Sequence, residues 1–262
     1  MAARCRTGSL LPGRNAYTVA MKVGLFVTCL LDVLRPSAAF AALRLLRAAG
    51  CEVSVPAGQT CCGQPGYNSG DRAAARALAL HTVRQFEACE YVVAPSGSCA
   101  GMMREHYPGL FSAGEPEAVS VRTFAGRVWE LTAFLHDVLQ AKPLAAGFGG
   151  RLTFHDSCSG LRELGVREQP RALLRAVPGL MLAEMRDSQV CCGFGGTFCV
   201  KYPDISAHLA ASKCRHIQAS GADAVTACDW GCLMNIEGRL RALGDGRTQV
   251  LHVAEVLAGP EP

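Results

Sequence analysis

The sequence predicts an α/β protein made of two pseudo-symmetric, cysteine-rich repeats, each with short parallel strands and flanking helices. Three observations support this prediction. The triplet Cys-Cys-Gly occurs at residues 61–63 and again at residues 191–193. An upstream cysteine precedes each triplet at nearly the same distance, Cys29 by 32 residues and Cys158 by 33. Short apolar runs alternate with helical patterns in the same order in both halves, which is typical of a repeated βα unit too small to form a core alone.

The first half is predicted to span residues 21–142 and to start with a continuous apolar run that leads to Cys29, the pattern of a strand buried on both faces. Pro36 begins a helix whose apolar stripe includes Phe40, and Gly50 ends it. Asp71 caps a second helix. The predicted strands are residues 23–27, 51–55 and 91–94, the predicted helices are residues 36–49, 72–86 and 121–139, and residues 95–99 form a turn that carries Cys99.

The second half repeats this order over residues 151–262, after a boundary rich in glycine and alanine at residues 142–150. A strand delivers His155, Asp156 and Cys158. The predicted strands are residues 151–154, 181–185 and 222–227, the predicted helices are residues 167–177, 204–219 and 250–257, and residues 228–232 form a turn that carries Cys232.

Residues 1–20 contain three arginines and no helical or strand periodicity, so a disordered extension is expected, with Met21 as a second possible start. The first apolar run contains Asp32 and shows no cleavage site, and no apolar run reaches the roughly 18 residues that span a membrane. We therefore predict a cytoplasmic protein, in which clustered cysteines are metal ligands or redox groups more often than disulfides. The net charge of +4 comes from scattered residues, which does not indicate nucleic-acid binding.

Eight of the 14 cysteines form two sets of four thiols. The sets are Cys29, Cys61, Cys62 and Cys99 in the first half and Cys158, Cys191, Cys192 and Cys232 in the second. Iron-sulfur clusters are held by cysteine thiolates, typically four for each [4Fe-4S] cluster, so the count favours one cluster in each repeat. Two adjacent cysteines can reach the same cluster only from an irregular loop, which Gly63 and Gly193 permit. The alternatives are structural zinc, which could also occupy just one of the two sites, and thiol redox chemistry or simple burial.

Two further residues near the second set are weaker candidates. His155 and Asp156 precede Cys158 and could tune a cluster or relay a proton during substrate oxidation. The alternative is a hydrogen-bonded histidine that supports the ligands or ends the strand. Cys228 stands four residues before Cys232 and is a candidate substitute ligand. No flavin, nicotinamide or phosphate-loop motif accompanies them, so a two-electron oxidation would need a partner's cofactor or chemistry at a cluster.

The spacing of Cys, Cys-Cys-Gly and Cys resembles the cysteine-rich CCG-domain family, whose domains occur in a subunit of heterodisulfide reductase and in iron-sulfur subunits of glycolate oxidase and anaerobic glycerol-3-phosphate dehydrogenase. The strings FHDSC, CCGFGGTF and DWGCLMNI, with two CCG repeats over residues 23–257, are most similar to the lactate utilization protein A family. This resemblance implies an iron-sulfur electron-transfer subunit of a cytoplasmic complex that oxidises L-lactate to pyruvate. It also implies a ferredoxin-type iron-sulfur partner and a third subunit.

One departure from the family pattern bears on the ligands. Many CCG domains end in Cys-x-x-Cys, whereas Ser96 and Asp229 stand here where the first of those cysteines would be, which argues against five-thiolate noncubane clusters. Two alternatives stay open. A subunit of a glycolate or glycerol-3-phosphate dehydrogenase, or of a heterodisulfide-reductase-like complex, would be expected to carry a ferredoxin module, which this sequence lacks. A zinc-stabilised interaction scaffold would be redox-silent.

Overall fold

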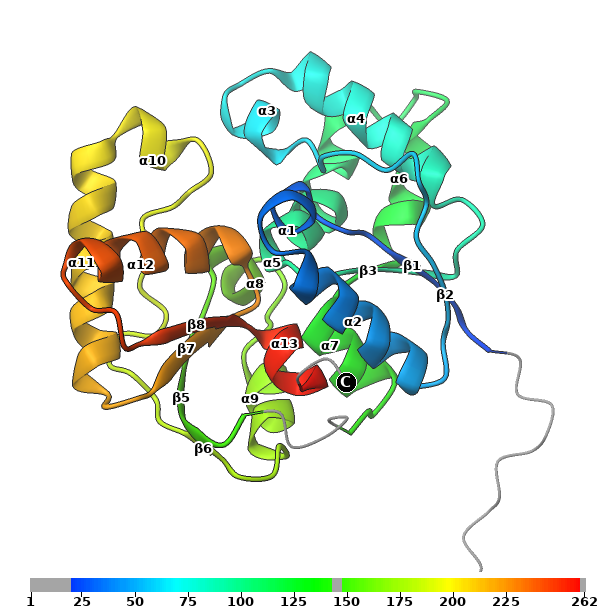
Figure 1. The fold of residues 1–262 in the computed structure, drawn as a ribbon. Coiled ribbons are helices and arrows are strands. Elements are labelled where there is room, and N and C mark those ends of the chain that lie inside the picture. Colours follow the sequence, from blue (N-terminus) through cyan, green and yellow to red (C-terminus); the bar gives the residue numbers. More distant parts are fainter. Residues whose placement is uncertain (1–19, 143–147, 260–262) are drawn as a thin grey trace, which may run out of the picture.

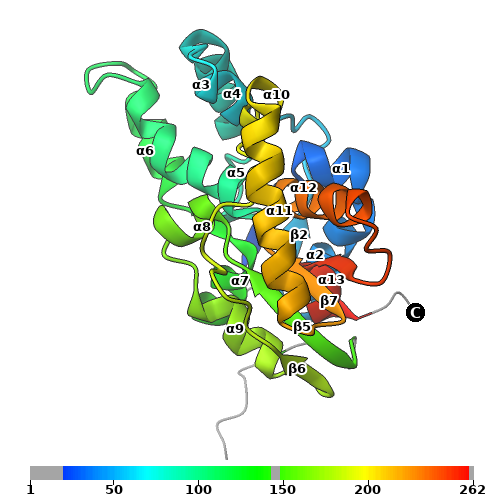
Figure 2. The same ribbon diagram turned by 90° about the vertical axis from the view of Figure 1, so that its left-hand side faces the viewer.

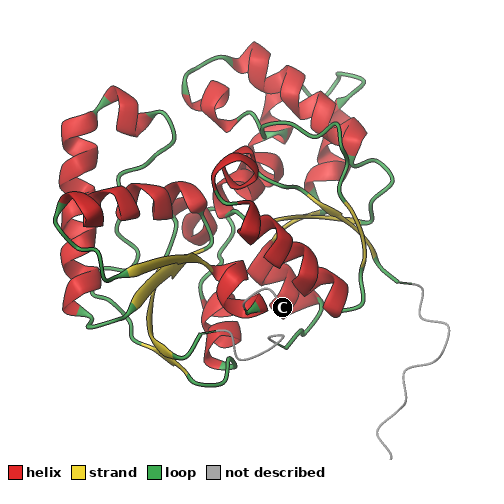
Figure 3. Cartoon of the chain, viewed as in Figure 1, coloured by secondary structure: helices red, strands yellow, loops and turns green. Residues whose placement is uncertain are grey.

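The computed structural model describes residues 20–142 and 148–259. Residues 1–19 of the extension predicted over residues 1–20, and residues 143–147 of the boundary predicted over residues 142–150, lie outside the described residues. Each half contains a fully parallel four-stranded sheet surrounded by helices, so the α/β prediction with two repeats is confirmed (Figure 3). The longest helix among the described residues has 17 residues, and none is both long and apolar enough to cross a membrane.

The elements of the first half are β1 (Lys22–Leu25), α1 (Cys29–Leu34), α2 (Pro36–Ala48), β2 (Glu52–Ser54), α3 (Gln64–Asn68), α4 (Arg72–Gln85), β3 (Tyr91–Ala94), α5 (Gly97–Gly101), η1 (Met102–His106), η2 (Pro108–Leu110), α6 (Ala118–Ala125), β4 (Val128–Glu130), α7 (Leu131–Ala133) and η3 (Phe134–Val138).

The elements of the second half are β5 (Gly150–His155), α8 (Cys158–Arg162), α9 (Glu168–Arg175), β6 (Leu180–Leu182), α10 (Phe198–Lys201), α11 (Pro203–Ala219), β7 (Ala224–Ala227), α12 (Trp230–Ala242), β8 (Gln249–His252) and α13 (Val253–Ala258).

Local sequence explains most of these boundaries. Pro36 occupies the first position of α2, and Gly50, at φ +88°, follows its end. The Asp71 side chain caps α4 by accepting a hydrogen bond from the Ala74 amide at 2.9 Å. The prediction for Phe40 is wrong: its side chain is 58% exposed, because the buried face of α2 is formed instead by alanines and by leucines further along the helix.

The two sheets have the same topology, β2-β1-β3-β4 in the first half and β6-β5-β7-β8 in the second (Figure 1). The fourth strand of each sheet was not predicted. The helix predicted over residues 121–139 is interrupted by β4, and the helix predicted over residues 250–257 is preceded by β8, which occupies its first residues. Both strands are short and run directly into a helix, so a single apolar run covers two elements, and periodicity cannot separate a buried strand from a helix.

The largest of the three hydrophobic clusters among the described residues is shared by the two halves. Helix α13 of the second half packs against α2 of the first, and Figure 1 shows the two helices side by side. Their contact includes Glu255, whose carboxylate accepts hydrogen bonds from Arg35 at 2.8 Å and from Ser37 at 2.7 Å. Helices α11 and α12 pack against each other on the face of the second sheet opposite α13. Helix α11 lies along the outside of this half (Figure 2). Since the core draws on both halves, each half depends on the other for burial of its apolar face.

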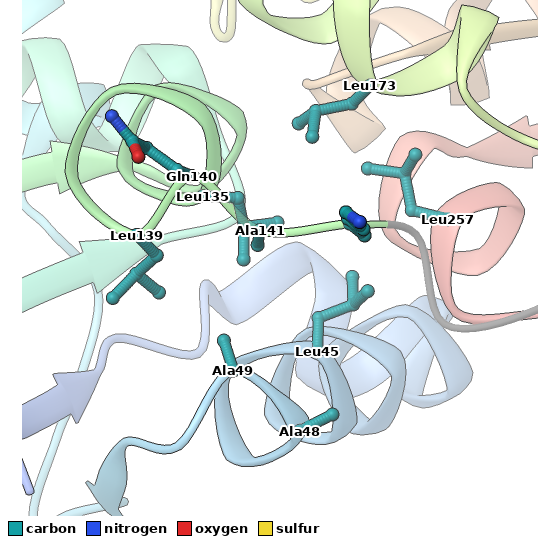
Figure 4. A pocket seen from close by; sticks show the side chains of 10 residues that line it. Leu45, Ala48, Ala49, Leu135, Leu139, Gln140, Ala141, Leu173 and Leu257 are labelled. Carbon is teal, nitrogen blue, oxygen red and sulfur yellow. The ribbon is translucent and has the colours of Figure 1, made fainter. Parts of the chain in front are cut away.

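A hollow of about 410 Å³ remains at the seam between the halves (Figure 4). Leu45 of α2, Leu135 of η3, Leu173 of α9 and Leu257 of α13 are among the described residues that line it. Its walls are mostly aliphatic, so they offer little chemistry for a metal or a catalytic step.

Candidate metal centre

Four of the eight predicted cysteines lie shortly after the end of a strand. Cys29 follows β1 as the first residue of α1, and Cys158 follows β5 as the first residue of α8. Cys99 and Cys232 follow β3 and β7, and both lie in the first turn of a helix, α5 and α12, where a turn was predicted. In α5 the helix starts early because the Ser96 hydroxyl caps it, accepting from the Cys99 amide at 3.3 Å. All four thiols therefore stand at the carboxyl ends of parallel strands, where α/β folds build their sites.

The first set brings its thiols into mutual contact. The Sγ atoms of Cys62 and Cys99 are 3.3 Å apart, and Cys61 contacts both Cys29 and Cys62. Gly63 has φ +85°, and its amide donates to the Cys61 Sγ at 3.4 Å. A residue with a Cβ rarely adopts this backbone conformation, so Gly63 allows two adjacent thiols to turn toward the same point.

The second set repeats this geometry. Gly193 has φ +86° and donates its amide to the Cys191 Sγ at 3.3 Å. Cys191 contacts Cys158 and Cys192, and Cys192 contacts Cys232. The structure thus brings each of the two predicted sets together, as a chain of neighbouring thiols.

The crowded thiols perturb one another's pKa values in the same way in both halves. Hydrogen bonds from the neighbouring thiols, Cys29 first, lower the pKa of Cys61 to about 2, and the same contact raises the pKa of Cys29. Cys158 likewise lowers the pKa of Cys191 to about 2 and has its own pKa raised. Metal binding requires thiolates, and such strongly coupled thiols at a strand end are typical of a functional site.

Side chains outside the cysteine motifs hold the second cysteine of each pair. The Tyr107 hydroxyl donates to the Cys62 carbonyl at 2.8 Å, and the Asn235 side-chain amide donates to the Cys192 carbonyl at 2.9 Å. Sequence reasoning did not find these two residues, because they differ in type and in distance from the motifs and so show no repeat. Both fix the loop that presents the paired thiols.

The two sets open into one shared cavity of about 550 Å³, which all eight cysteines line. Ser96 and Asp229, which stand where many CCG domains have the first cysteine of Cys-x-x-Cys, also line this cavity. They are in contact, because the Ser96 hydroxyl donates to Asp229 Oδ1 at 2.6 Å. The Ser98 amide and hydroxyl donate to the same oxygen at 3.1 and 2.6 Å. Helices α5 and α8 approach closely here, since a Cβ on Gly97 would lie 2.8 Å from the Cα of Gly160. The two sites are therefore adjacent across the contact between the halves.

His155 and Asp156 point in different directions. His155 Nδ1 lies 3.1 Å from the Ser188 carbonyl. A ring nitrogen of His155 and the Sγ atoms of Cys192 and Cys232 form a group of ligand atoms within 4.8 Å of one another. Contacts with Cys192 and then His155 lower the pKa of Cys232 to about 7. Asp156 instead forms a buried bidentate ion pair with Arg171, at 2.7 and 2.8 Å.

The structure places Cys228 away from both sets. Its side chain is buried at the interface between the halves, 3.8 Å from the Thr132 hydroxyl, and it does not line the shared cavity. Burial raises the pKa of this thiol well above its usual value, which disfavours a thiolate ligand. The suggested substitute ligand therefore has no support in this geometry.

The donor set fits a thiolate-held metal group. Each half offers four neighbouring thiols, and a backbone amide donates to one sulfur in each set. The His155 Nε2 atom is buried without a hydrogen-bond partner among the described residues. Four thiolates suit either an iron-sulfur cluster or tetrahedral zinc, and amide donors to sulfur are one means of tuning a cluster's potential.

Comparisons with known proteins match both halves of this chain. The family model "Cysteine-rich domain" (CCG) matches residues 23–104 and again residues 152–237. Lactate utilization protein A of Geobacillus sp. strain WCH70 is 46% identical over 90% of this chain and 99% of its own length. The proteins of the same name from Bacillus cytotoxicus and Oceanobacillus iheyensis are 44% and 42% identical over 90% of this chain, and over 98% and 96% of their own lengths.

Solved structures match only distantly. An aspartate racemase homologue from Pyrococcus horikoshii and a putative Asp/Glu racemase from Yersinia pestis align over 90% of this chain and 95% of theirs, at 10% and 11% identity and TM-scores of 0.33 and 0.36. Likenesses of that size carry no information on the site. The two matched repeats and the full-length relatives together place this chain in the lactate utilization protein A family of CCG cysteine-rich domain proteins.

Proposed function

We propose that this protein is the iron-sulfur electron-transfer subunit of a cytoplasmic complex that oxidises L-lactate to pyruvate. Each of the two four-thiol sets holds one [4Fe-4S] cluster. The observation that carries this proposal is that all eight thiols line one cavity in two matching sets. The name of the relatives, lactate utilization protein A, supplies the metabolic role.

The chain's own residues prepare these sites. Gly63 and Gly193 turn the paired thiols toward one point and donate backbone amides to Cys61 and Cys191. Tyr107 and Asn235 fix these loops by donating hydrogen bonds to the carbonyls of Cys62 and Cys192. When bound, iron-sulfur clusters accept and pass single electrons, and amide donors to sulfur help set the potential. The apolar residues packed around each set limit access of water.

The cavity itself is poorly suited to lactate. Its described lining residues include no arginine or lysine, whereas they include the carboxylates of Asp229 and Glu163. Lactate is an anion, and its carboxylate would need a cationic or bidentate donor. Negatively charged thiolates would weaken binding further. We therefore assign lactate oxidation to another subunit of the complex and electron transfer to this one.

An apolar surface beside the cavity is the proposed docking site for the ferredoxin-type partner. Val200 lines the cavity and is 79% exposed, and Tyr202 and Ile205, just after it in sequence, are 55% and 54% exposed. Exposed apolar residues next to a functional cavity are typical of interaction surfaces. A partner that covers them would bring its own cluster close to the second set, and a third subunit would complete the complex.

Zinc at one of the sites is the second candidate. The 3.3 Å approach of the Cys62 and Cys99 sulfurs favours it, because a single ion draws four thiolates into a small tetrahedron. In that case the zinc-bound half stabilises the fold and the other half carries the electron. A protein with zinc at both sites would be an interaction scaffold.

The test is anaerobic purification followed by iron, sulfide and zinc analysis and by EPR of the dithionite-reduced protein. We expect about four to eight irons per chain, with roughly half lost in Cys62→Ser and half in Cys192→Ser. Cys199→Ser is the matched control, because Cys199 only donates to the Gly196 carbonyl, at 3.2 Å, which serine also does. Lactate-dependent reduction of the clusters in the reconstituted complex tests the pathway. Stoichiometric zinc without iron or sulfide would refute electron transfer.

A further inference from the structure

We propose that His155 is a nitrogen ligand of the metal group in the second set, so that the two sites differ chemically: the first is held by thiolates alone and the second by thiolates and one imidazole. This inference rests on the proposed function only in that the second set must hold a metal. Nε2 of His155 becomes a fifth candidate donor beside Cys158, Cys191, Cys192 and Cys232, and a cluster with four protein ligands takes the imidazole in place of one thiolate.

The placement of the imidazole carries the proposal. His155 is fully buried, at the end of strand β5, and its Nε2 has no hydrogen-bond partner among the described residues. A ring nitrogen of His155 and the Sγ atoms of Cys192 and Cys232 lie within 4.8 Å of one another, and Nδ1 is already engaged with the Ser188 carbonyl. Buried polar atoms in native proteins are almost always satisfied, so an orphaned ring nitrogen beside two thiols indicates a missing partner.

The opposite side of the ring fixes which nitrogen is free. Nδ1 of His155 faces the Ser188 carbonyl at 3.1 Å, and a carbonyl oxygen only accepts. Nδ1 therefore donates to this carbonyl, and Nε2 is the ring nitrogen that remains free to bind a metal. This is the arrangement in which metal-binding histidines are oriented by a backbone carbonyl on their other nitrogen.

The Ser188 carbonyl is itself held in place. It also accepts from the Asp156 amide at 3.1 Å and from the buried Lys213 ammonium at 3.2 Å. Asp156 is locked by its bidentate pair with Arg171. These contacts leave the imidazole little freedom to rotate, which is the preorganisation that a ligand needs.

The state of the loaded thiols favours coordination over a simple hydrogen bond. A thiol could donate its proton to the bare Nε2, but thiols lose their protons when they bind metal. Nε2 would then face thiolates with neither a proton nor a donor. Burying an unpaired acceptor is destabilising, and coordination to a metal within reach removes that cost.

The first half lacks this donor. Both residues stand three positions before the first cysteine of their set, and the counterpart of His155 is Phe26. Phe26 is fully buried and packs against Phe86, with ring centroids 5.9 Å apart. A neutral imidazole in place of thiolate charge raises the potential of an iron-sulfur centre, and the nearby Lys213 ammonium acts in the same direction. The second site is therefore the one on which an electron rests.

The experiment is pulsed EPR of the anaerobic, full-length protein with and without ¹⁵N-labelled histidine, in every paramagnetic state between oxidised and dithionite-reduced. We expect a strong coupling to a directly bonded histidine nitrogen in the wild type. This nitrogen coupling should disappear in His155→Phe, which introduces the residue type that Phe26 has at the equivalent position of the first half. The coupling should persist in His106→Gln. His106 is the matched control because it lines the same cavity from the first half. His155→Phe should also shift the potential of one centre to a more negative value.

The outcomes separate this inference from the proposed function. Iron and sulfide with no histidine coupling, or with only the weak coupling of a hydrogen bond, would overturn the ligand while leaving electron transfer intact. The labelled wild type decides this point even if His155→Phe does not fold. If the protein holds zinc alone, electron transfer fails, and X-ray absorption at the zinc edge decides the ligand: a nitrogen in the shell supports it and sulfur alone overturns it. A protein that binds no metal refutes both.

Discussion

Replacing Glu130 by glutamine should change how stability depends on pH. This carboxyl group caps α7 and is buried against the second half, and its Oε2 accepts from the Thr132 amide at 2.8 Å, the Thr132 hydroxyl at 2.5 Å and the Ala133 amide at 3.1 Å. Burial raises its pKa from the usual 4.5 to about 7, against the lowering effect of these hydrogen bonds. The folded protein thus holds this proton more tightly than the unfolded chain does.

The sign and size follow from proton linkage. Stability is full below pH 4.5, the unfolded pKa, and falls as the pH rises to about 7, where the folded carboxyl ionises. Each pKa unit is worth about 1.4 kcal/mol, so the wild type loses roughly 3 kcal/mol over this range. Glu130→Gln removes the ionisable group and should escape the loss.

The assay is the thermal midpoint of both proteins between about pH 4 and pH 8, with the metal content held constant. A loss of roughly 3 kcal/mol lowers the midpoint by about 6–10 °C for a chain of this size. As the pH rises, the midpoint of the wild type should therefore fall by this amount relative to that of Glu130→Gln. Glu87→Gln is the control, because Glu87 is exposed and belongs to the same half. Parallel pH profiles of Glu130→Gln and the wild type would refute the reasoning.

Three further predictions concern single contacts. Glu255 should contribute to stability with the opposite pH dependence, because its hydrogen bonds outweigh burial and lower its pKa in the folded protein. Its stabilising contribution is present above the unfolded pKa and is lost in acid, so the melting temperatures of Glu255→Gln and the wild type should converge as the pH falls. Arg171→Met leaves the buried Asp156 carboxylate unpaired and should cost about 3–5 kcal/mol in denaturant unfolding, a loss that the double variant with Asp156→Asn largely reverses. Gly193→Ala should destabilise more than Gly63→Ala, since both residues have positive φ but a Cβ meets a backbone oxygen at 2.6 Å only at Gly193; equal melting points would contradict this.

Much of the fold was predictable because local chemistry and tertiary structure agree. The run before Cys29 forms β1, Asp71 caps α4, and residues 91–94 form β3 as predicted. The failures occur where one apolar run serves two elements. In β4 and the helix after it, residues are buried on all sides, so neither the strand period of two nor the helix period stands out.

For the candidate site, the repeat of Cys-Cys-Gly grouped the thiols, and the structure brings each group together. The shared cavity could not be predicted, because it depends on how the two halves pack. The same holds for the contact between Ser96 and Asp229 and for the support that Tyr107 gives to the Cys62 carbonyl. These contacts join residues 133 and 45 positions apart, and no local pattern encodes them.

The contact between Ser96 and Asp229 has a consequence for the ancestry of the chain. The two residues hold equivalent positions in the two repeats and meet at the contact between the halves. In a dimer of identical halves the same residue would face itself there, and two buried aspartates would repel each other. A hydroxyl donor can face a carboxylate acceptor only once the two copies are free to diverge. Two repeats with separate sequences have that freedom, and the difference between His155 in one half and Phe26 at the equivalent position in the other is a second example of it.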